Sequence, residues 1–401
     1  MNYKLILLLL TLNLSAWAQN TLEDGIWHAD LQLNDSTNLS FILKTSAGTM
    51  VIENADERIE LTDIRYEDDS VWARFPYYDS ELRFTNLGPL LNGEFVNHGK
   101  TSNNVLYFRA LKDMPYRFTL QPLPASGNLS GRWQLIFDGE EGVNKSNVAI
   151  FNQRGNRVTG TVLTATGDHR FLDGELNGNK LKLSTFNGAF VMLYDGILNN
   201  DGTLTGHFYS GKTGYDTWTA FRNDSASLPD PSSLSFIKPS AGKFNFSFPD
   251  INGKRWTMDD ASFRNKVSVV QIMGTWCPNC LDESVFLNNY FLKNHTSGVE
   301  MIAIDYERTT DSVKVWNNIK RIRERLGITY PIVFGGISNR DSASATLPMI
   351  DKIFAYPTTI FVDKKGVVRK IHTGFSGPAA PEEFEHYQQE FDVFVRNLLA
   401  E

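Results

Sequence analysis

The sequence predicts a multidomain protein in which an N-terminal antiparallel all-β region, made of two similar β units, precedes an α/β domain. From about Leu22 to Asn223, short alternating runs such as residues 203–208 are separated by Asn-Gly, Asp-Gly and Gly-Asn pairs, which are typical of hairpin turns. Parts of this region recur after about 110 residues. Beyond it, continuous apolar runs alternate with helical patterns, which favours parallel strands.

The chain begins with the pattern of a signal peptide, which we assign to residues 1–18. A short basic start ends at Lys4, a Leu-rich run follows, and Ala16-Trp17-Ala18 has the small-x-small form that signal peptidases cut. The alternative is an uncleaved membrane anchor, but the apolar run is much shorter than the roughly 20 residues that span a bilayer. We therefore expect an exported protein that is soluble after cleavage.

The internal repeat divides the β region into β unit 1, residues 19–120, and β unit 2, residues 121–223. Gly25-Ile26-Trp27 recurs as Gly131-Arg132-Trp133, and Phe108-Arg109 recurs as Phe221-Arg222. The same repeat fits two halves of one larger barrel or sandwich. We expect Trp27 and Trp133 to be core residues, and a ligand-binding role of the β region is the alternative.

A stretch rich in Ser, Pro and Asp, residues 224–242, is the predicted linker to the last domain, residues 243–401. The expected elements of that domain are a strand at 267–273, a helix at 281–293, a strand at 299–304, a helix at 312–326, strands at 357–362 and 367–372 joined by a turn at 363–366, and a closing helix at 381–399.

Charge and cysteine content limit the possible functions. The formal net charge of −7 argues against a nucleic-acid partner, which requires a basic surface. The chain has only two cysteines, Cys277 and Cys280, so no disulfide can join distant segments, and this pair needs a local explanation. Nothing in the charge or hydrophobic pattern indicates an oligomeric state.

Cys277 and Cys280 form a Cys-x-x-Cys motif between a predicted strand and a predicted helix, the context typical of redox-active dithiols. At a helix start, unpaired backbone N–H groups and the positive end of the helix dipole favour the thiolate of the first cysteine. We expect Cys277 to attack a disulfide and Cys280, one turn later, to resolve the mixed disulfide. Pro278 fits the first helical turn because it has no N–H to satisfy there.

A structural disulfide and a zinc site are the weaker alternatives for this motif. A structural disulfide between Cys277 and Cys280 would close a very short loop and contribute only about 2 kcal/mol. A zinc site needs four ligands, and no further cysteine or neighbouring histidine supplies them. We expect neither a metal nor a cofactor.

With this motif, the C-terminal part of the chain resembles the TlpA/ResA-type thioredoxin-like disulfide reductases. The resemblance covers about residues 243–401 and rests on residues 244–253, Trp276-Cys277-Pro278-Asn279-Cys280, Glu283 and residues 356–363. It implies a thioredoxin-like fold and a cis Pro357 that faces the cysteines, with neighbouring backbone that pairs with an extended substrate. It also implies a periplasmic location, disulfide-containing client proteins and a membrane-embedded thiol donor.

The resemblance further implies a buried acid near the second strand of the domain, which helps to move the proton of the resolving thiol. The candidates are Glu307, which we prefer, and Asp305; ordinary solvated carboxylates at a strand end are the alternative. We expect Glu283 to be a helix-surface acid. We expect Trp276 to pack beside the dithiol and to form part of the substrate-contact face.

The remaining charged side chains of this domain are expected on its surface. His295 and His372 lie too far along the chain from the motif to be assigned a role. Arg321, Arg323 and Arg325 are expected on the solvated face of a helix, with partner docking as the alternative.

The sequence as a whole indicates an exported protein-disulfide oxidoreductase that reduces or isomerises the disulfides of client proteins. The Pro278-Asn279 dipeptide adds no positive charge, so we expect a reduction potential nearer that of thioredoxin than that of DsbA. One alternative is an oxidase that uses the same cysteines in reverse. Another is a ligand- or partner-binding protein with an accessory redox domain.

Overall fold

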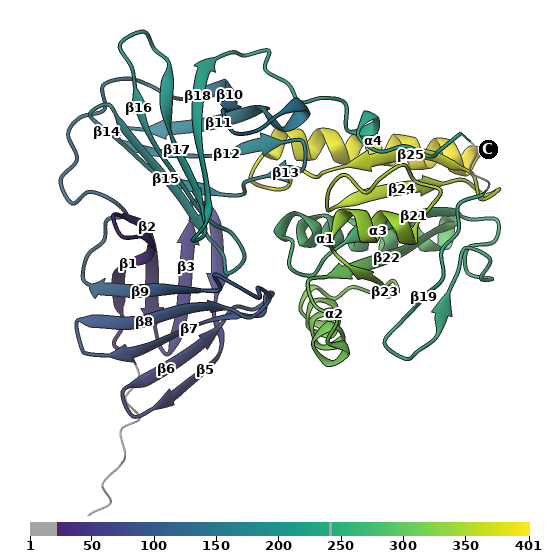
Figure 1. Cartoon of the computed structure of the whole chain (residues 1–401), viewed down its shortest axis with the longest axis horizontal. Helices are drawn as coiled ribbons and strands as arrows, with labels where there is room; N and C mark the ends of the chain where they lie inside the picture. The colour runs from purple at the N-terminus through teal and green to yellow at the C-terminus, as the bar shows by residue number, and fades with distance from the viewer. Residues whose placement is uncertain (1–21, 240–242) are drawn as a thin grey trace, which may run out of the picture.

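The computed structural model describes residues 22–239 and 243–401, so the predicted signal peptide lies outside the described residues. Figure 1 shows two β units on one side of the molecule and the C-terminal domain beside both of them. The predicted architecture, an all-β region followed by an α/β domain, is confirmed. None of the described helices combines the length and apolar character needed to cross a bilayer.

β unit 1 is a single antiparallel sheet in the order β4-β3-β2-β1-β9-β8-β7-β6-β5. Alternate residues of its strands are buried, and Trp27 lies wholly inside, where its indole N–H donates to Thr45. The strands are β1 (Gly25–Asn34), β2 (Thr37–Ser46), β3 (Thr49–Asn54), β4 (Glu57–Glu60), β5 (Thr62–Glu67), β6 (Ser70–Arg74), β7 (Ser80–Asn86), β8 (Leu90–Asn97) and β9 (Val105–Lys112).

β unit 2 repeats this plan in a second antiparallel sheet, in the order β11-β10-β18-β17-β16-β15-β14-β12-β13. An additional pairing of β11 with β12 closes this sheet on itself. Trp133 is buried at the position equivalent to Trp27, so both tryptophans are core residues as expected. The elements are β10 (Gly131–Phe137), η1 (Gly142–Asn144), β11 (Ser146–Arg154), β12 (Arg157–Thr164), β13 (Gly167–Asp168), β14 (Leu172–Asn177), β15 (Lys180–Phe186), β16 (Val191–Leu198), β17 (Leu204–Ser210) and β18 (Gly214–Arg222).

The C-terminal domain is a mixed sheet in the order β23-β22-β21-β24-β25, with helices packed against it. The predicted parallel pairing holds for β21, β22 and β23, and β24 and β25 form the predicted hairpin. From the linker onward, the elements are η2 (Pro231–Ser233), β19 (Phe248–Pro249), β20 (Arg255–Trp256), β21 (Val267–Met273), α1 (Pro278–Asn294), η3 (His295–Ser297), β22 (Val299–Glu307), α2 (Ser312–Leu326), β23 (Ile332–Ile337), α3 (Arg340–Thr346), β24 (Thr358–Val362), β25 (Val368–Thr373) and α4 (Pro381–Ala400).

Helix α1 begins at Pro278, one turn before the predicted start at 281. The extended backbone of Cys277 forms the N-cap, and the cap sulfur accepts the N–H of Cys280. Proline at the first helical position has the required backbone angle and no N–H to satisfy. Helical periodicity gives no signal for this turn, because its residues are all buried and show no polar face.

β unit 1 and the C-terminal domain share one hydrophobic core. Their buried apolar residues form a continuous cluster that includes Tyr78 and Cys277, whereas most of β unit 2 has a separate core. Tyr78 is buried and lies on the loop between β6 and β7. The active-site motif is therefore packed against β unit 1.

Candidate active site

The two cysteines lie at the junction of strand β21 and helix α1, as the sequence predicts. Both thiols are free, Cys277 is 6% exposed and Cys280 is fully buried. The Cys280 backbone N–H lies 3.3 Å from the Cys277 sulfur, and it is one of the N–H groups that a helix leaves unpaired at its start. This N–H and the helix dipole both favour negative charge on Cys277.

The surroundings of Cys280 favour its neutral thiol. Burial raises the pKa of its thiol well above the usual value, and the neighbouring Cys277 raises it further. The two sulfurs are therefore chemically different, with a capped, slightly exposed Cys277 and an enclosed, protonated Cys280. That Cys277 attacks and Cys280 resolves stays a prediction from the sequence, with which this difference in exposure is consistent.

A loop before β24 covers the other side of Cys277. The Tyr356-Pro357 peptide is cis, as the resemblance implies, and the Cys277 thiol donates to the Tyr356 carbonyl oxygen at 3.5 Å. The Trp276 ring packs edge-on against the Tyr356 ring at 5.4 Å, and its N–H donates to the Tyr306 carbonyl at 2.9 Å. Trp276 is thus fixed beside the dithiol, half-buried.

Glu283 is a buried acid, and the expectation that it lies on the helix surface is wrong. The residue is fully buried, and its carboxylate accepts hydrogen bonds from Gln271, Thr359 and Tyr387 at 2.9, 2.7 and 3.1 Å. Burial raises its pKa to about 7. Helix α1 is enclosed by the sheet and α4, so the face that carries Glu283 has no access to solvent.

Gln271 joins this acid to the resolving cysteine, and sequence reasoning missed it. Its amide nitrogen donates to the Cys280 carbonyl oxygen and to Glu283, at 3.1 and 2.9 Å. Its amide oxygen accepts from Ser284 at 2.9 Å. The available signal was an amide side chain inside the mostly apolar run of strand β21, since a buried amide needs partners.

Asp305 and Glu307 form a buried acid pair behind the motif. They are 0% and 2% exposed, so the alternative of solvated carboxylates is wrong. Thr275 binds both, because its backbone N–H donates to Asp305 at 3.1 Å and its hydroxyl donates to Glu307. Burial raises the pKa of each acid, and the Glu307 charge raises that of Asp305 further.

β unit 2 contacts the motif directly through the hairpin β12–β13. The Asn279 amide donates to the Asp168 carbonyl oxygen at 3.0 Å, and the Gly377 N–H donates to the Asp168 carboxylate at 2.6 Å. Gly167 adopts a φ of +137°, and a Cβ there would lie 1.9 Å from the Asn279 amide nitrogen. Only glycine permits this close approach.

An interdomain charge cluster, Glu57–Arg170–Asp282, joins all three parts of the chain beside this contact. Arg170 of β unit 2 forms ion pairs with Glu57 of β unit 1 and with Asp282 of helix α1. The three side chains are 9–20% exposed. Burial raises the pKa of Asp282 to about 7, although Arg170 opposes this shift. The cluster lies two residues beyond Cys280, so domain packing and the active site are connected.

Only some of the residues expected on the surface of this domain are exposed. His295 is exposed, as are Arg323 and Arg325. His372 is half-buried against Tyr387, and burial lowers its pKa to about 4, so the surface assignment is wrong for it. Arg321 is also half-buried and donates to the Tyr77 carbonyl of β unit 1 at 3.2 Å.

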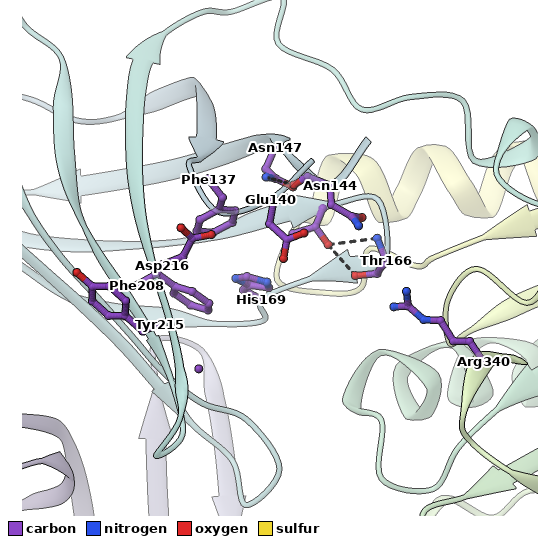
Figure 2. Close-up of a pocket in the computed structure, with 12 residues that line it drawn as sticks. Phe137, Glu140, Asn144, Asn147, Thr166, His169, Phe208, Tyr215, Asp216 and Arg340 are labelled. Atoms are coloured by element: carbon purple, nitrogen blue, oxygen red, sulfur yellow. Dashed lines mark hydrogen bonds between the residues drawn. The ribbon is translucent and has the colours of Figure 1, made fainter. Parts of the chain in front are cut away.

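A separate pocket of about 350 Å³ lies in β unit 2 (Figure 2). Aromatic and polar side chains line it, among them Phe208, His169 and Asp216, and Arg340 extends toward it from the C-terminal domain. His169 stacks on Phe208, and burial lowers its pKa to about 4. Within the described residues, no group of three or more His, Cys, Asp or Glu side chains is arranged to hold a metal ion.

The C-terminal domain is similar to known proteins. Residues 240–388 match the Redoxin family model. The thiol-disulfide oxidoreductase ResA of Geobacillus thermodenitrificans is 30% identical over 130 residues, which are 32% of this chain and 66% of that protein. ResA of Bacillus subtilis is 28% identical over 130 residues, 32% of this chain and 64% of that protein. The chain thus spans slightly less than two thirds of the length of these relatives.

The solved structures that match this chain include a thiol:disulfide interchange protein from Chlorobium tepidum, which is described as a thioredoxin family protein. It is 22% identical, with a TM-score of 0.31, and the match covers 40% of this chain and 99% of that one. The family match and the ResA relatives support a TlpA/ResA-like, Redoxin-type domain in the C-terminal part of this chain.

Proposed function

We propose that this protein is an exported thiol-disulfide oxidoreductase that reduces or isomerises disulfides of client proteins through Cys277 and Cys280. The observation that carries the proposal is the unequal dithiol at the start of α1. Cys277 receives an N–H at its sulfur, and burial raises the pKa of Cys280. The relatives named thiol-disulfide oxidoreductases support the same chemistry.

The proposed reaction has two exchange steps. The Cys277 thiolate attacks one sulfur of a client disulfide, which releases the other client sulfur as a thiolate and leaves a mixed disulfide. Cys280 then loses its proton and attacks the Cys277 sulfur, which releases the second client thiolate. The client gains two electrons and the protein is left with a Cys277–Cys280 disulfide. A membrane-embedded thiol donor is proposed to reduce it again.

The second step needs a group that accepts the Cys280 proton. The candidates proposed from the sequence are Glu307 and Asp305, which share the Thr275 contact behind the motif. Glu283 joins them as a third candidate, because Gln271 links it to Cys280 and its charge acts on the pKa of that thiol. Trp276, Pro278 and Pro357 are proposed to shape the surface against which the client chain lies.

The test is reduction of insulin disulfides by the mature protein with dithiothreitol as the electron source. We expect the wild type to accelerate the reaction and Cys277→Ser to lose all acceleration. A Ser342→Ala variant, which removes an exposed hydroxyl on α3, is the matched control. Equal rates with wild type and Cys277→Ser would remove the proposal. Oxidation of a reduced client by the oxidised protein, at a higher rate, would favour the oxidase instead.

The predicted organisation and location belong to the same proposal. We propose β units at residues 19–120 and 121–223, a linker at 224–242 and a periplasmic mature protein that starts at Gln19. N-terminal sequencing of the protein recovered from a periplasmic fraction tests the cleavage after Ala18. A protein found intact in the cytoplasm would overturn the export proposal.

A ligand-binding role of the β region is the second candidate, and the pocket in Figure 2 favours it. Its volume of about 350 Å³ is within the range of small-molecule sites, and its lining offers the aromatic surface of Phe137 and Phe208 beside several polar groups that can orient a ligand. A screen by thermal shift for compounds that stabilise the protein, repeated with Phe208→Ala, tests this role. A ligand that stabilises both proteins equally binds elsewhere.

A further inference from the structure

A second pocket lies between β unit 1 and the C-terminal domain, beside the active-site motif. Its volume is about 260 Å³. β unit 1 contributes Tyr78 and Lys100, and the C-terminal domain contributes Trp276, Arg308 and Arg321. Trp276 forms one wall and precedes Cys277 in the chain, and the charge of Cys277 acts on the pocket residue Arg308, so a group bound here lies near the attacking sulfur.

This pocket has an excess of positive charge in a protein whose formal net charge is −7. The acidic side chains of its lining are Asp79 and Glu307, and burial raises the pKa of Glu307, which favours its neutral form. The cationic side chains of the lining are Lys100, Arg308, Lys314 and Arg321.

The two cations nearest the motif are Lys100 and Arg308; burial lowers the pKa of Arg308, and the charges of Cys277 and Glu307 oppose this shift. Within the part of the chain that the structure describes, no carboxylate forms a salt bridge with Lys100 or Arg308. Lys100 is half-buried; burial lowers its pKa, and the nearby Arg308 charge lowers it further. The Arg308 guanidinium stacks over the Trp276 ring, 4.0 Å from its centre. Two cations held close together in this way favour binding of an anion.

The β units occupy the neighbouring approaches to the dithiol. Asp168 binds Asn279 and Gly377 on one side, and Tyr78 packs into the shared core close to Cys277. The positive pocket remains as an open space adjoining Trp276. A group next to a disulfide at Cys277 can extend into this pocket.

We propose that the pocket formed by Lys100, Arg308 and Trp276 binds a carboxylate group adjacent to the substrate disulfide. This inference rests on the proposed function and names its substrate class, which is disulfides flanked by carboxylates. The carboxylate has two possible sources, an acidic residue beside a cystine of a client chain or the carboxylates of a small disulfide such as oxidised glutathione.

Paired substrates with and without carboxylates beside the disulfide test the proposal. Two disulfide-bonded peptides carry either Glu or Gln beside each cysteine, and oxidised glutathione is compared with the neutral bis(hydroxyethyl) disulfide. The readout is the ratio of kcat/KM for the acidic and the neutral member of each pair. We expect the wild type to prefer the acidic member by about tenfold, the size of one charge-assisted hydrogen bond. The preference falls as ionic strength rises.

Substitution of the cations assigns this preference to the pocket. In Lys100→Gln the ratio falls toward one, and Lys314→Gln, on the exposed start of α2, gives a smaller fall without disturbing buried structure. Lys180→Gln, an exposed lysine of β15 that does not line the pocket, keeps the wild-type ratio. A preference confined to the peptides identifies client chains, and one confined to glutathione identifies small disulfides.

Two results would count against the inference in distinguishable ways. Equal rates on the acidic and neutral members, with both reduced, overturn the carboxylate site and leave the proposed function intact. A preference that Lys100→Gln and Lys314→Gln both retain also overturns it, since the charge recognition then lies elsewhere. Failure to reduce any of the four substrates overturns the proposed function together with the inference.

Discussion

Replacement of Glu283 by glutamine should remove a pH dependence of stability that the buried carboxyl creates. The pKa of this group is about 7 in the folded protein, compared with 4.5 for an exposed glutamate. Between these values the folded state holds a proton that the unfolded state has released. Stability therefore falls as pH rises from about 4.5 to 7, and the full contribution is present only below the unfolded pKa.

The size of this effect follows from the two pKa values. Linkage gives a loss of about 2.5 kcal/mol in the free energy of unfolding between pH 5 and pH 8 from Glu283 alone. Glu283→Gln cannot ionise, so this part of the pH dependence disappears. The amide also changes the hydrogen bonds to Gln271 and Tyr387, but that cost is the same at both pH values and cancels from the comparison.

The assay is denaturant unfolding of the reduced protein at several pH values, followed by tryptophan fluorescence. The stability difference between Glu283→Gln and wild type should shift by about 2.5 kcal/mol in favour of the variant from pH 5 to pH 8. Glu324→Gln, which changes an exposed carboxylate of α2, should show no such shift. If the free energy of unfolding changed with pH in the same way in Glu283→Gln and wild type, the reasoning would be refuted, because ionisation of the Glu283 carboxyl would then not lower the stability of the folded protein.

Three further results are expected. Cys280→Ser should trap mixed disulfides with client proteins on Cys277, detectable by mass spectrometry; free turnover in that variant would contradict the resolving role. Glu307→Gln should lower the pKa of Asp305 by removing a neighbouring acid and move the pH–rate profile by about one unit to lower pH, whereas an unmoved profile excludes the pair from proton transfer. Arg170→Met leaves two buried carboxylates without their cation and should destabilise the assembled protein by about 3–5 kcal/mol, read from the urea midpoint; an unchanged midpoint would show that the cluster contributes nothing.

The local part of the active site could be predicted from the sequence because it depends on neighbouring residues. The strand, the Cys-x-x-Cys turn and the helix follow one another directly, and the capping role of Cys277 depends only on the next three residues. The cis Pro357 came from the resemblance, since periodicity and composition carry no signal for it. The burial of Asp305 also came from the resemblance, because the predicted strand ends at 304 whereas β22 continues to Glu307.

Two elements and most long-range contacts were beyond sequence reasoning. Strand β23 is interrupted by Gly335-Gly336, and α3 buries only Ala343, so neither shows a periodic apolar pattern. The contact of Arg170 with Asp282 joins residues more than a hundred positions apart, and nothing local to either indicates it. The same holds for the positive pocket, whose walls come from two domains.

The measurement that tests the central claim most directly is the reduction potential of Cys277 and Cys280. The mature protein is equilibrated in glutathione or dithiothreitol buffers, and Trp276 fluorescence reports the redox state. We predict one reversible two-electron transition below about −200 mV, near the thioredoxin range. A potential above about −150 mV would contradict the reductase assignment and favour the oxidase. The absence of any reversible transition would contradict the redox function itself.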